Sequence, residues 1–407
     1  MEAGHKPSDA LDRRLAPLLL LGVGHAAAAD DGDGMSVYSL PRGEMLHLPC
    51  LHPGSAFVRD HRIWATPQGW LLMARRGSPE TFLWDPFTGR RIGLSPAHDG
   101  TVLAVDHWRR RCLLSRRRPT DPGCVVLVVD LEDTVLWHCR PAPAGRGNGT
   151  DEPPPPPPEE EDDQQWARHE YLQPGTRHHE HGDDGLCVIG RLTAVDGSKL
   201  LVDLVDHRLA VLELSSQEPV VTVVAAEGVS VACTSNSTNL VESDGELYCV
   251  WFRYPIRCLR IVARVSVYKL DYMAAKGSAT WMKVKSLGGR RSFFIGQDRI
   301  GASFDAEEAG LKPNCIYYYW LLNNRAALYA HDMERGTTAV HNLYPDDLSY
   351  HLSPAITMMP TARSMSIYSL IGLTHILFTV LYTRINENTV YIMVRIISPQ
   401  MHAIQIL

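Results

Sequence analysis

A strand–turn–strand unit recurs along the chain, and its spacing limits the folds that the chain can adopt. The clearest copy runs from Thr81 to Leu94 and turns at Asp85-Pro86-Phe87-Thr88-Gly89. The Asp begins this turn, the Pro presets φ at the next position, and the Gly accepts the left-handed conformation that reverses the chain. Looser copies lie at 37–48, 126–137, 209–224, 265–284 and 328–336. The first three copies are centred near residues 38, 84 and 128, so the unit recurs every 44 to 46 residues.

The period selects one all-β architecture. Short strands with regular turns and almost no helical periodicity favour a barrel, a sandwich or a propeller. A repeat of this length matches one four-stranded propeller blade. We therefore predict a β-propeller of about six four-stranded blades over residues 15–362, with seven blades as the alternative. Residues 1–14 are predicted to be a disordered N-terminus, and residues 363–407 an apolar tail without the turns of a further blade.

The strand pattern stops between residues 141 and 184. This stretch contains a glycine-rich segment at 145–149, six prolines at 153–158 and five acidic residues at 159–163. Such a composition buries too little apolar surface to fold, so we predict a disordered insertion between blades. We interpret the prolines as part of a stiff acidic spacer, with a polyproline II ligand for an SH3, WW or profilin-like partner as the alternative.

Two apolar segments resemble membrane signals. Residues 15–29 follow a pair of arginines as a secretory signal peptide would, but Pro17, Gly22 and Gly24 interrupt them. We expect an opening buried β-strand there, with the signal peptide as the alternative. Residues 364–383 carry no charge and are barely long enough to cross a bilayer, and serine, threonine, glycine and histidine dilute them. A membrane is therefore not expected as a partner, and a tail anchor is the alternative.

Cysteine usage and charge indicate the cytosol or the nucleus. The nine cysteines are an odd number, form no CxxC pair and mostly adjoin strand-like apolar residues, as buried reduced thiols do. A secreted disulfide scaffold is usually shorter and richer in cysteine, so a reducing compartment is the simpler interpretation. The net charge of −6 gives no overall attraction to nucleic acid, and we expect a monomer that binds none.

Two motifs within residues 240–320 resemble a known family. The segment Leu287-Gly288-Gly289-Arg290-Arg291-Ser292-Phe293-Phe294-Ile295-Gly296 precedes Gly310-Leu311-Lys312-Pro313-Asn314-Cys315-Ile316-Tyr317. This pair resembles the signature of the plant KIB-type β-propeller family, and weaker resemblance covers most of residues 17–360. The resemblance implies a kelch-like propeller that recognises proteins, and in members with an F-box a propeller that selects substrates for a ubiquitin ligase. The residues before Pro17 are too few for an F-box, so we do not expect the ligase role to carry over.

The signature is expected to be structural. Gly288 and Gly289 suit a tight turn, residues 293–295 read as a buried strand, and Asn314 can bond neighbouring backbone at the entry to the next strand. A binding surface is the alternative. The residues singled out are Leu287, Gly288, Gly296, Gly310, Leu311, Lys312, Pro313, Asn314 and Tyr317.

Known catalytic motifs are missing from the sequence. There is no GxSxG elbow, HExxH zinc helix, P-loop or GxGxxG opening a helix. Three histidines within residues 178–181 could ligate zinc, but a solvated polar loop is the preferred interpretation. Six arginines within 109–118 could meet an acidic partner or a phosphate backbone, but we expect solvated arginines at the two ends of a strand.

These observations predict a non-enzymatic propeller that binds protein partners through the loops at one mouth of its disc. We expect no catalytic residues, no metal and no cofactor. The alternatives are a membrane-tethered propeller and a glycan-acting propeller enzyme, which would need two carboxylates at a defined separation.

Overall fold

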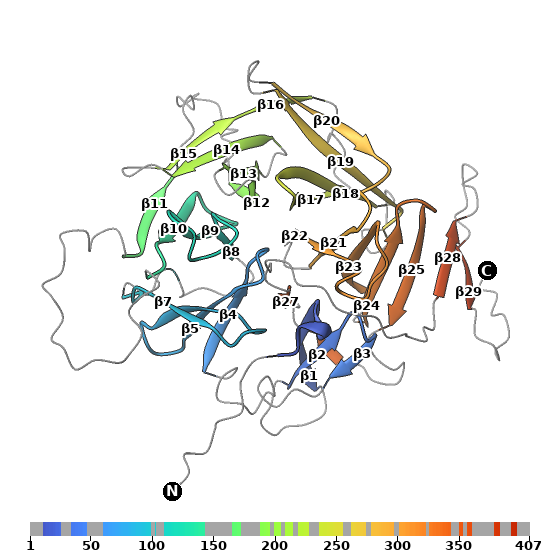
Figure 1. Ribbon diagram of the computed structural model, residues 1–407, viewed down its shortest axis with the longest axis horizontal. Coiled ribbons are helices and arrows are strands. Elements are labelled where there is room, and N and C mark those ends of the chain that lie inside the picture. The colour runs from blue at the N-terminus through green and yellow to red at the C-terminus, as the bar shows by residue number, and fades with distance from the viewer. Residues whose placement is uncertain are drawn as a thin grey trace, which may run out of the picture.

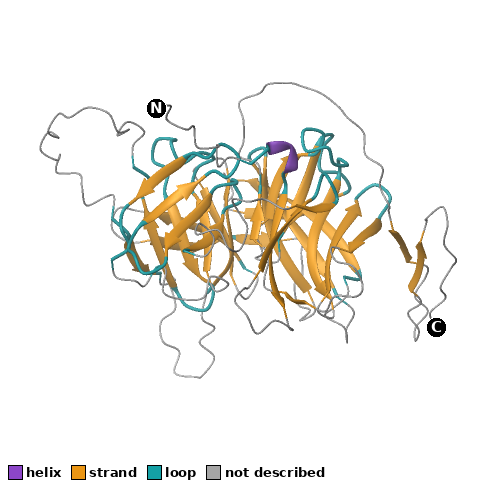
Figure 2. Cartoon of the chain, turned by 90° about the horizontal axis from the view of Figure 1, so that it is seen from below, coloured by secondary structure: helices purple, strands orange, loops and turns teal. Residues whose placement is uncertain are grey.

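The computed structural model is an all-β propeller in which six sheets surround a common axis (Figure 1). In side view the sheets form a disc, with loops on both of its faces (Figure 2). The described residues are 11–25, 34–46, 60–98, 102, 110–142, 165–171, 188–195, 199–204, 208–214, 219–227, 236–254, 262–273, 278–296, 301–322, 325–342, 350–352, 356–359, 378–382 and 392–396. Within them the only helical element is the short 3-10 turn η1 (Arg13–Leu15).

Three blades have four antiparallel strands each, in chain order from the axis outward. Blade two contains β4 (His61–Ala65), β5 (Leu71–Arg75), β6 (Thr81–Trp84) and β7 (Arg91–Leu94). Blade three contains β8 (Arg110–Leu114), β9 (Val126–Asp130), β10 (Val135–Cys139) and β11 (Ala167–Glu170). Blade four contains β12 (Ile189–Val195), β13 (Lys199–Leu204), β14 (Leu209–Leu214) and β15 (Pro219–Val223).

The other three sheets contain further strands, so the expectation of four strands in every blade is wrong for them. Blade one contains β1 (Leu18–His25), β2 (Gly34–Ser39), β3 (Glu44–Leu46), β26 (Tyr350–Leu352) and β27 (Ile356–Met358). Blade five contains β17 (Asn236–Ser243), β18 (Glu246–Arg253), β19 (Arg264–Met273), β20 (Ser278–Val284) and the edge strand β16 (Ala225–Glu227). Blade six contains β21 (Arg291–Ile295), β22 (Gly301–Asp305), β23 (Cys315–Leu322), β24 (Arg325–Asp332), β25 (Thr337–Asn342), β28 (Phe378–Tyr382) and β29 (Ile392–Ile396).

Each of the six repeat units in the sequence belongs to a different blade. Their centres at residues 38, 84, 128, 212, 268 and 329 lie in β2, β6, β9, β14, β19 and β24. The prediction of six blades is therefore confirmed, and the seven-bladed alternative is wrong.

The core is divided into six clusters, one between each pair of neighbouring blades. This division follows from the two-residue period of a strand, which sends successive side chains to opposite faces of the blade. In β8, for example, Leu113 packs toward blade four and the adjacent Leu114 toward blade two. Every blade thus buries both of its faces against its neighbours.

The two ends of the propeller close the ring by pairing in blade one. The strand β1 pairs on one edge with β2 and on the other with β26 and β27, all antiparallel. The innermost strands also contact one another around the axis, from β27 through β4, β8, β12 and β17 to β22. At Gly301 of β22 the approach is so close that a Cβ atom would collide with the Leu240 backbone, which explains why this position is a glycine.

The structure corrects two predicted boundaries. The predicted insertion at 141–184 contains β11, the outer strand of blade three, so that part of it is ordered. Polar residues can form this strand because it lies at a sheet edge, where one face and one edge meet water. Leu11 is buried and donates a backbone hydrogen bond to Pro86, so the N-terminal residues from 11 onward belong to the propeller. The rest of the insertion and residues 1–10 lie outside the described part.

The two candidate membrane segments form strands where they are described. The expected opening strand is β1, whose Leu18 and Leu19 are fully buried. In the tail, β28 and β29 extend the outer edge of blade six, and residues 364–377 lie outside the described part. The described part of the chain contains no helix that is long and apolar enough to cross a bilayer.

Ring closure predicts different outcomes for two truncated chains. A chain that ends after residue 360 keeps β26 and β27, and we expect it to unfold cooperatively near the melting temperature of the full chain. A chain that ends after residue 346 leaves one edge of β1 without a partner. We expect it to melt about 10 °C or more below the full chain, or to lose its cooperative transition. In a chain of this size, each kcal/mol of lost stability lowers the melting temperature by about 4 °C or less, so a shift of this size means a loss of several kcal/mol. Thermal melting followed by circular dichroism checks both, and equal melting of the two chains would contradict the closure.

Candidate binding cleft between two blades

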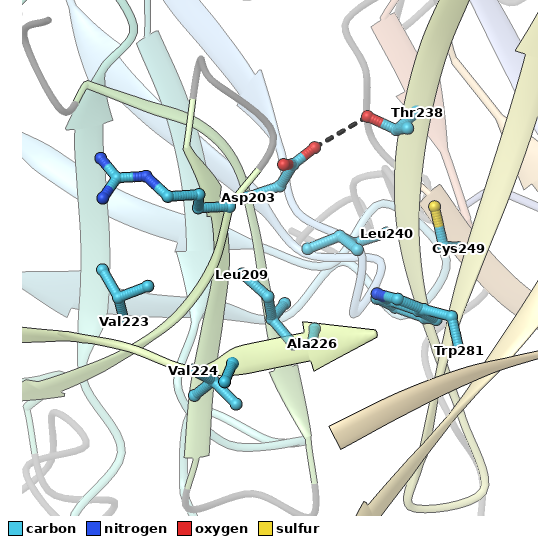
Figure 3. A pocket seen from close by; sticks show the side chains of 11 residues that line it. Asp203, Leu209, Val223, Val224, Ala226, Thr238, Leu240, Cys249 and Trp281 are labelled. Carbon is cyan, nitrogen blue, oxygen red and sulfur yellow. Dashed lines mark hydrogen bonds between the residues drawn. The ribbon is translucent and has the colours of Figure 1, made fainter. Parts of the chain in front are cut away.

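A cleft of about 300 Å³ opens between blades four and five (Figure 3). The cluster at this interface contains eight buried residues among those described, whereas the cluster between blades three and four contains thirteen. The cleft lies beside this smaller cluster and shares Leu209, Leu240 and Cys249 with it. The cleft is lined by Asp203, Arg208, Leu209, Val223, Val224, Ala225, Ala226, Thr238, Leu240, Cys249 and Trp281.

The polar wall of the cleft is held by a buried ion pair. Asp203 of β13 accepts a hydrogen bond of 2.9 Å from Arg191 of β12 and one of 2.7 Å from the Thr238 hydroxyl of β17. Arg191 also reaches Ser237 at 3.5 Å, so the network joins blade four to blade five. Because removing one partner would leave an uncompensated buried charge, this network fixes the two blades relative to each other.

The other walls are mostly apolar. Leu209 and Val224 from blade four face Leu240 and Trp281 from blade five, and Figure 3 shows their side chains around one space. The Cys249 thiol also lines the space, and burial raises its pKa to about 12. Val223 at the margin of the cleft is 39% exposed, so the apolar lining continues to the surface.

Three cations, Arg264, Lys283 and Lys285, flank the cleft along blade five. Lys283 lies two residues beyond Trp281, on the same face of β20. Burial lowers the pKa of Lys283, and so do the neighbouring charges of Arg264 and Lys285. Since both neighbouring charges are positive, this flank favours an anionic ligand group.

Among the described residues that line the cleft, the ionisable groups with possible reactivity are Asp203 and Cys249. Its one lining carboxylate, Asp203, is paired with Arg191, and the Cys249 thiol stays protonated at neutral pH. Among the described residues, no group of three or more histidines, cysteines and carboxylates is placed to hold a metal ion. An apolar space with a fixed polar wall and a cationic flank suits recognition of a side chain.

The signature residues lie elsewhere, in and beside blade six, where Asn314 joins three segments of backbone. Its side-chain oxygen accepts a hydrogen bond from the Leu287 amide at 2.9 Å, and its side-chain nitrogen donates to Glu334 at 3.1 Å. Its backbone bonds Arg291 and Met333, and its φ of 57° lies in the left-handed region that Asn tolerates better than most residues. The signature asparagine is therefore a structural junction between strands.

Lys312 and Tyr317 complete this junction. The Lys312 ammonium pairs with Asp332, and its backbone N–H donates to the Tyr317 hydroxyl at 3.0 Å. Burial opposes ionisation of Asp332, but the Lys312 hydrogen bond and the amides of Arg335 and Glu334 lower its pKa. These bonds fix the turn from β24 to β25 against the entry to β23.

The remaining signature residues make turns and fill the core. Gly288 and Gly310 have φ values of 84° and 65°, which other residues rarely adopt, and Gly296 is buried at the end of β21. Leu287 is buried between blades five and six, Leu311 packs against the cluster between blades six and one, and Pro313 is partly buried. None of the signature residues lines the cleft.

The arginine cluster is only partly solvated. Arg110 is 4% exposed, lies over the Trp137 ring at 4.2 Å and pairs with Asp130 at 3.6 Å, so the expectation of solvated arginines at this end of the strand is wrong. Arg117 and Arg118 at the other end are exposed. The histidines at 178–181 lie outside the described part.

The sequence contained little signal for the cleft. Nine of its eleven lining residues come from seven strands in two blades, Arg208 and Val224 lie just outside strands, and none of them stands out in the sequence. A detectable hint was the pair of cations Lys283 and Lys285, which follow Met282 at the end of β20, beyond the residues that pair with the edge strand β16.

Comparison with known proteins identifies the family of the signature. A family model described as the KIB1-4 β-propeller matches residues 37–346, which confirms the resemblance inferred from the two motifs. No curated protein matches the sequence at a significant level.

Several solved propellers are similar in structure at low identity. Hsv2 of Kluyveromyces marxianus has 12% identity and a TM-score of 0.28, and the match covers 62% of this chain and 65% of that one. The periplasmic gluconolactonase PpgL of Pseudomonas aeruginosa has 10% identity and a TM-score of 0.33, with 84% and 99% covered. The propeller domain of Cps50 (Swd1) of Myceliophthora thermophila has 10% identity and a TM-score of 0.30, with 82% and 89% covered.

The junction at Asn314 predicts a graded loss of stability. Asn314→Ala removes two side-chain hydrogen bonds and replaces Asn by a residue that tolerates a left-handed φ less well, so we expect the free energy of unfolding to fall by about 2–4 kcal/mol. Asn314→Gly loses the same bonds without the backbone strain, and its loss should be smaller. Urea denaturation measures both values, and a wild-type stability for Asn314→Ala would contradict the assignment.

A buried histidine beside this junction predicts a dependence of stability on pH. Burial lowers the pKa of His331 to about 4 from an ordinary 6.5, and its Nδ1 bonds Thr338 at 3.0 Å. Between these values the unfolded chain takes up a proton that the folded chain does not, so stability falls as the pH drops from 6.5 to 4. We expect His331→Gln to remove up to about 3 kcal/mol of this decline. Denaturation curves at pH 7, 6, 5 and 4 test it, and parallel pH profiles would contradict it.

Proposed function

The chain belongs to the KIB1-4 β-propeller family, and we propose that it is a non-enzymatic interaction propeller whose binding site is the cleft between blades four and five. The partner in this proposal is a protein with an acidic segment that carries an apolar anchor residue. The observation that carries the proposal is the apolar cleft beside the cations of blade five.

The shape and lining of the cleft support an apolar anchor. A space of about 300 Å³ is large enough for one aromatic or large aliphatic side chain. Trp281 and Leu240 would contact this side chain, and aromatic residues in such pockets contribute much of the energy of protein interfaces. The exposed margin at Val223 would widen the contact.

The charge beside the cleft supports an acidic segment. Arg264, Lys283 and Lys285 lie close enough together for two of them to lower the pKa of the third. An anionic partner relieves that repulsion, and complementary charge also speeds association. The acidic groups of the partner would therefore follow the anchor along β20.

The pairing of Asp203 and the protonated state of the Cys249 thiol support binding rather than catalysis. A glycan-acting propeller would use two carboxylates at a defined separation, whereas Asp203 is the one carboxylate among the lining residues and is held by Arg191. The Cys249 thiol, with its pKa raised by burial, is a poor nucleophile.

A peptide-display screen against the full chain tests the proposal. We expect the enriched peptides to share an aromatic or large aliphatic residue flanked by Asp or Glu. Trp281→Ala should weaken their binding about tenfold or more through loss of the anchor contact, and Lys283→Glu should weaken it through charge reversal. Isothermal titration measures both affinities.

Arg117→Glu is the matched control, since Arg117 is an exposed cation on blade three. It changes the net charge as Lys283→Glu does, and it should leave the affinity unchanged. Peptides without acidic residues, or binding that survives both cleft variants, would contradict the proposal.

Affinity purification of the full chain addresses the relation to F-box members of the family. In our proposal the chain binds its partner without a ligase, in the cytosol or nucleus. Recovery of Skp-like and cullin subunits would instead make it a substrate-binding part of a ubiquitin ligase.

A further inference from the structure

Two histidines meet on the outer strands of blade three. The Nε2 atoms of His138 in β10 and His169 in β11 are 2.9 Å apart. Their rings are nearly parallel, with an interplanar angle of 6° and centroids 4.8 Å apart. Both side chains are partly exposed, so solvent and ions can reach the pair.

Strand pairing brings these rings together. His138 lies opposite Ala167 and His169 lies opposite Leu136, so the histidines are diagonal neighbours across the two strands. The period of two residues places both on the face toward blade four, where Leu136 and Tyr171 pack.

The strand that carries His169 is held at both ends. Before it, the Trp166 ring N–H donates to the Thr81 hydroxyl of blade two at 3.3 Å. After it, Tyr171 is 1% exposed, and its hydroxyl accepts the Ile189 amide of blade four at 3.0 Å. The position of His169 relative to His138 is therefore fixed by the neighbouring blades rather than by the pair itself.

We propose that His138 and His169 form a two-histidine site for a divalent transition metal such as zinc, with water completing the coordination. Zinc–imidazole bonds of 2.0–2.1 Å place two ligand nitrogens about 2.8–3.0 Å apart at a bond angle of 90° and about 3.3–3.4 Å apart at the tetrahedral angle of 109°. The observed 2.9 Å reaches the tetrahedral spacing with a shift of about 0.4 Å. Imidazole pairs suit zinc, copper and nickel, whereas magnesium prefers oxygen ligands.

The metal would take the place of the hydrogen bond that now joins the two rings. In that bond one Nε2 donates and the other accepts, whereas a bound metal needs the lone pair of both. Each ring then carries its proton on Nδ1. Because protons compete for the same lone pairs, metal affinity should fall as the pH decreases below the ordinary histidine pKa. The site is independent of the cleft, which lies between blades four and five.

Titration of the untagged full chain with zinc, followed by calorimetry, tests the site. We expect one zinc-binding event that is weaker at pH 5.5 than at pH 7.5, and no comparable heat with magnesium. His138→Asn and His169→Asn should each weaken zinc binding about tenfold or more, because each removes one ligand. Zinc should raise the melting temperature of the wild type but not of these variants, provided that their circular dichroism matches the wild type.

A triple variant with Asn in place of His178, His179 and His181 is the control, because these histidines lie nearby in sequence. It should bind zinc with wild-type affinity. Zinc binding that is unchanged in both the His138 and His169 variants, or lost only in the triple variant, would overturn the proposal, and so would a wild type that binds no zinc. If one single variant fails to fold, the other decides the result.

Discussion

The pairing of β1 with β26 and β27 is the interaction on which the ring depends. It connects residues 18–25 with residues 350–358, so the blade that begins the chain is completed by its end. Among the described strands, every other blade takes its inner strand from its own part of the sequence, whereas blade one pairs residues more than 300 positions apart (350 − 25 = 325). Loop-closure entropy opposes such a contact, and the burial of Leu18 and Leu19 on the two faces of β1 offsets it.

The same turn recurs where the outer strands reverse. Asp85 to Gly89 in blade two and Asp332 to Gly336 in blade six each close with a backbone hydrogen bond from the Gly to the Asp, and both glycines have positive φ. Ser39 to Gly43 in blade one has the same geometry with Ser in place of Asp. Blades one, two and six therefore share the same turn, while the side chains that pack between neighbouring blades differ from one interface to the next. Among the described residues, the cluster between blades four and five has the fewest buried members, and there the cleft opens.

Local signals in the sequence predicted the repeating parts of the fold. Asp, Pro and Gly at set positions identified the turns, and the period of about 45 residues identified the blade. The sequence did not reveal β11, because Ala167 to Glu170 is a polar edge strand inside a stretch of prolines and acidic residues. The cleft and the histidine pair could not be predicted for a different reason. Asp203 meets Thr238, and His138 meets His169, only through strand register and blade packing, which a linear reading of residues does not provide.

Ring closure has a consequence for the synthesis of the protein. The ribosome releases β1 first, but the partners of its inner edge are made more than 300 residues later. At about 5–20 residues per second, this edge stays open for roughly 15 seconds to a minute. During that time an apolar strand with unpaired backbone groups can join a strand of another nascent chain. Fast translation of the later blades shortens the time for which this edge is open and so favours correct assembly.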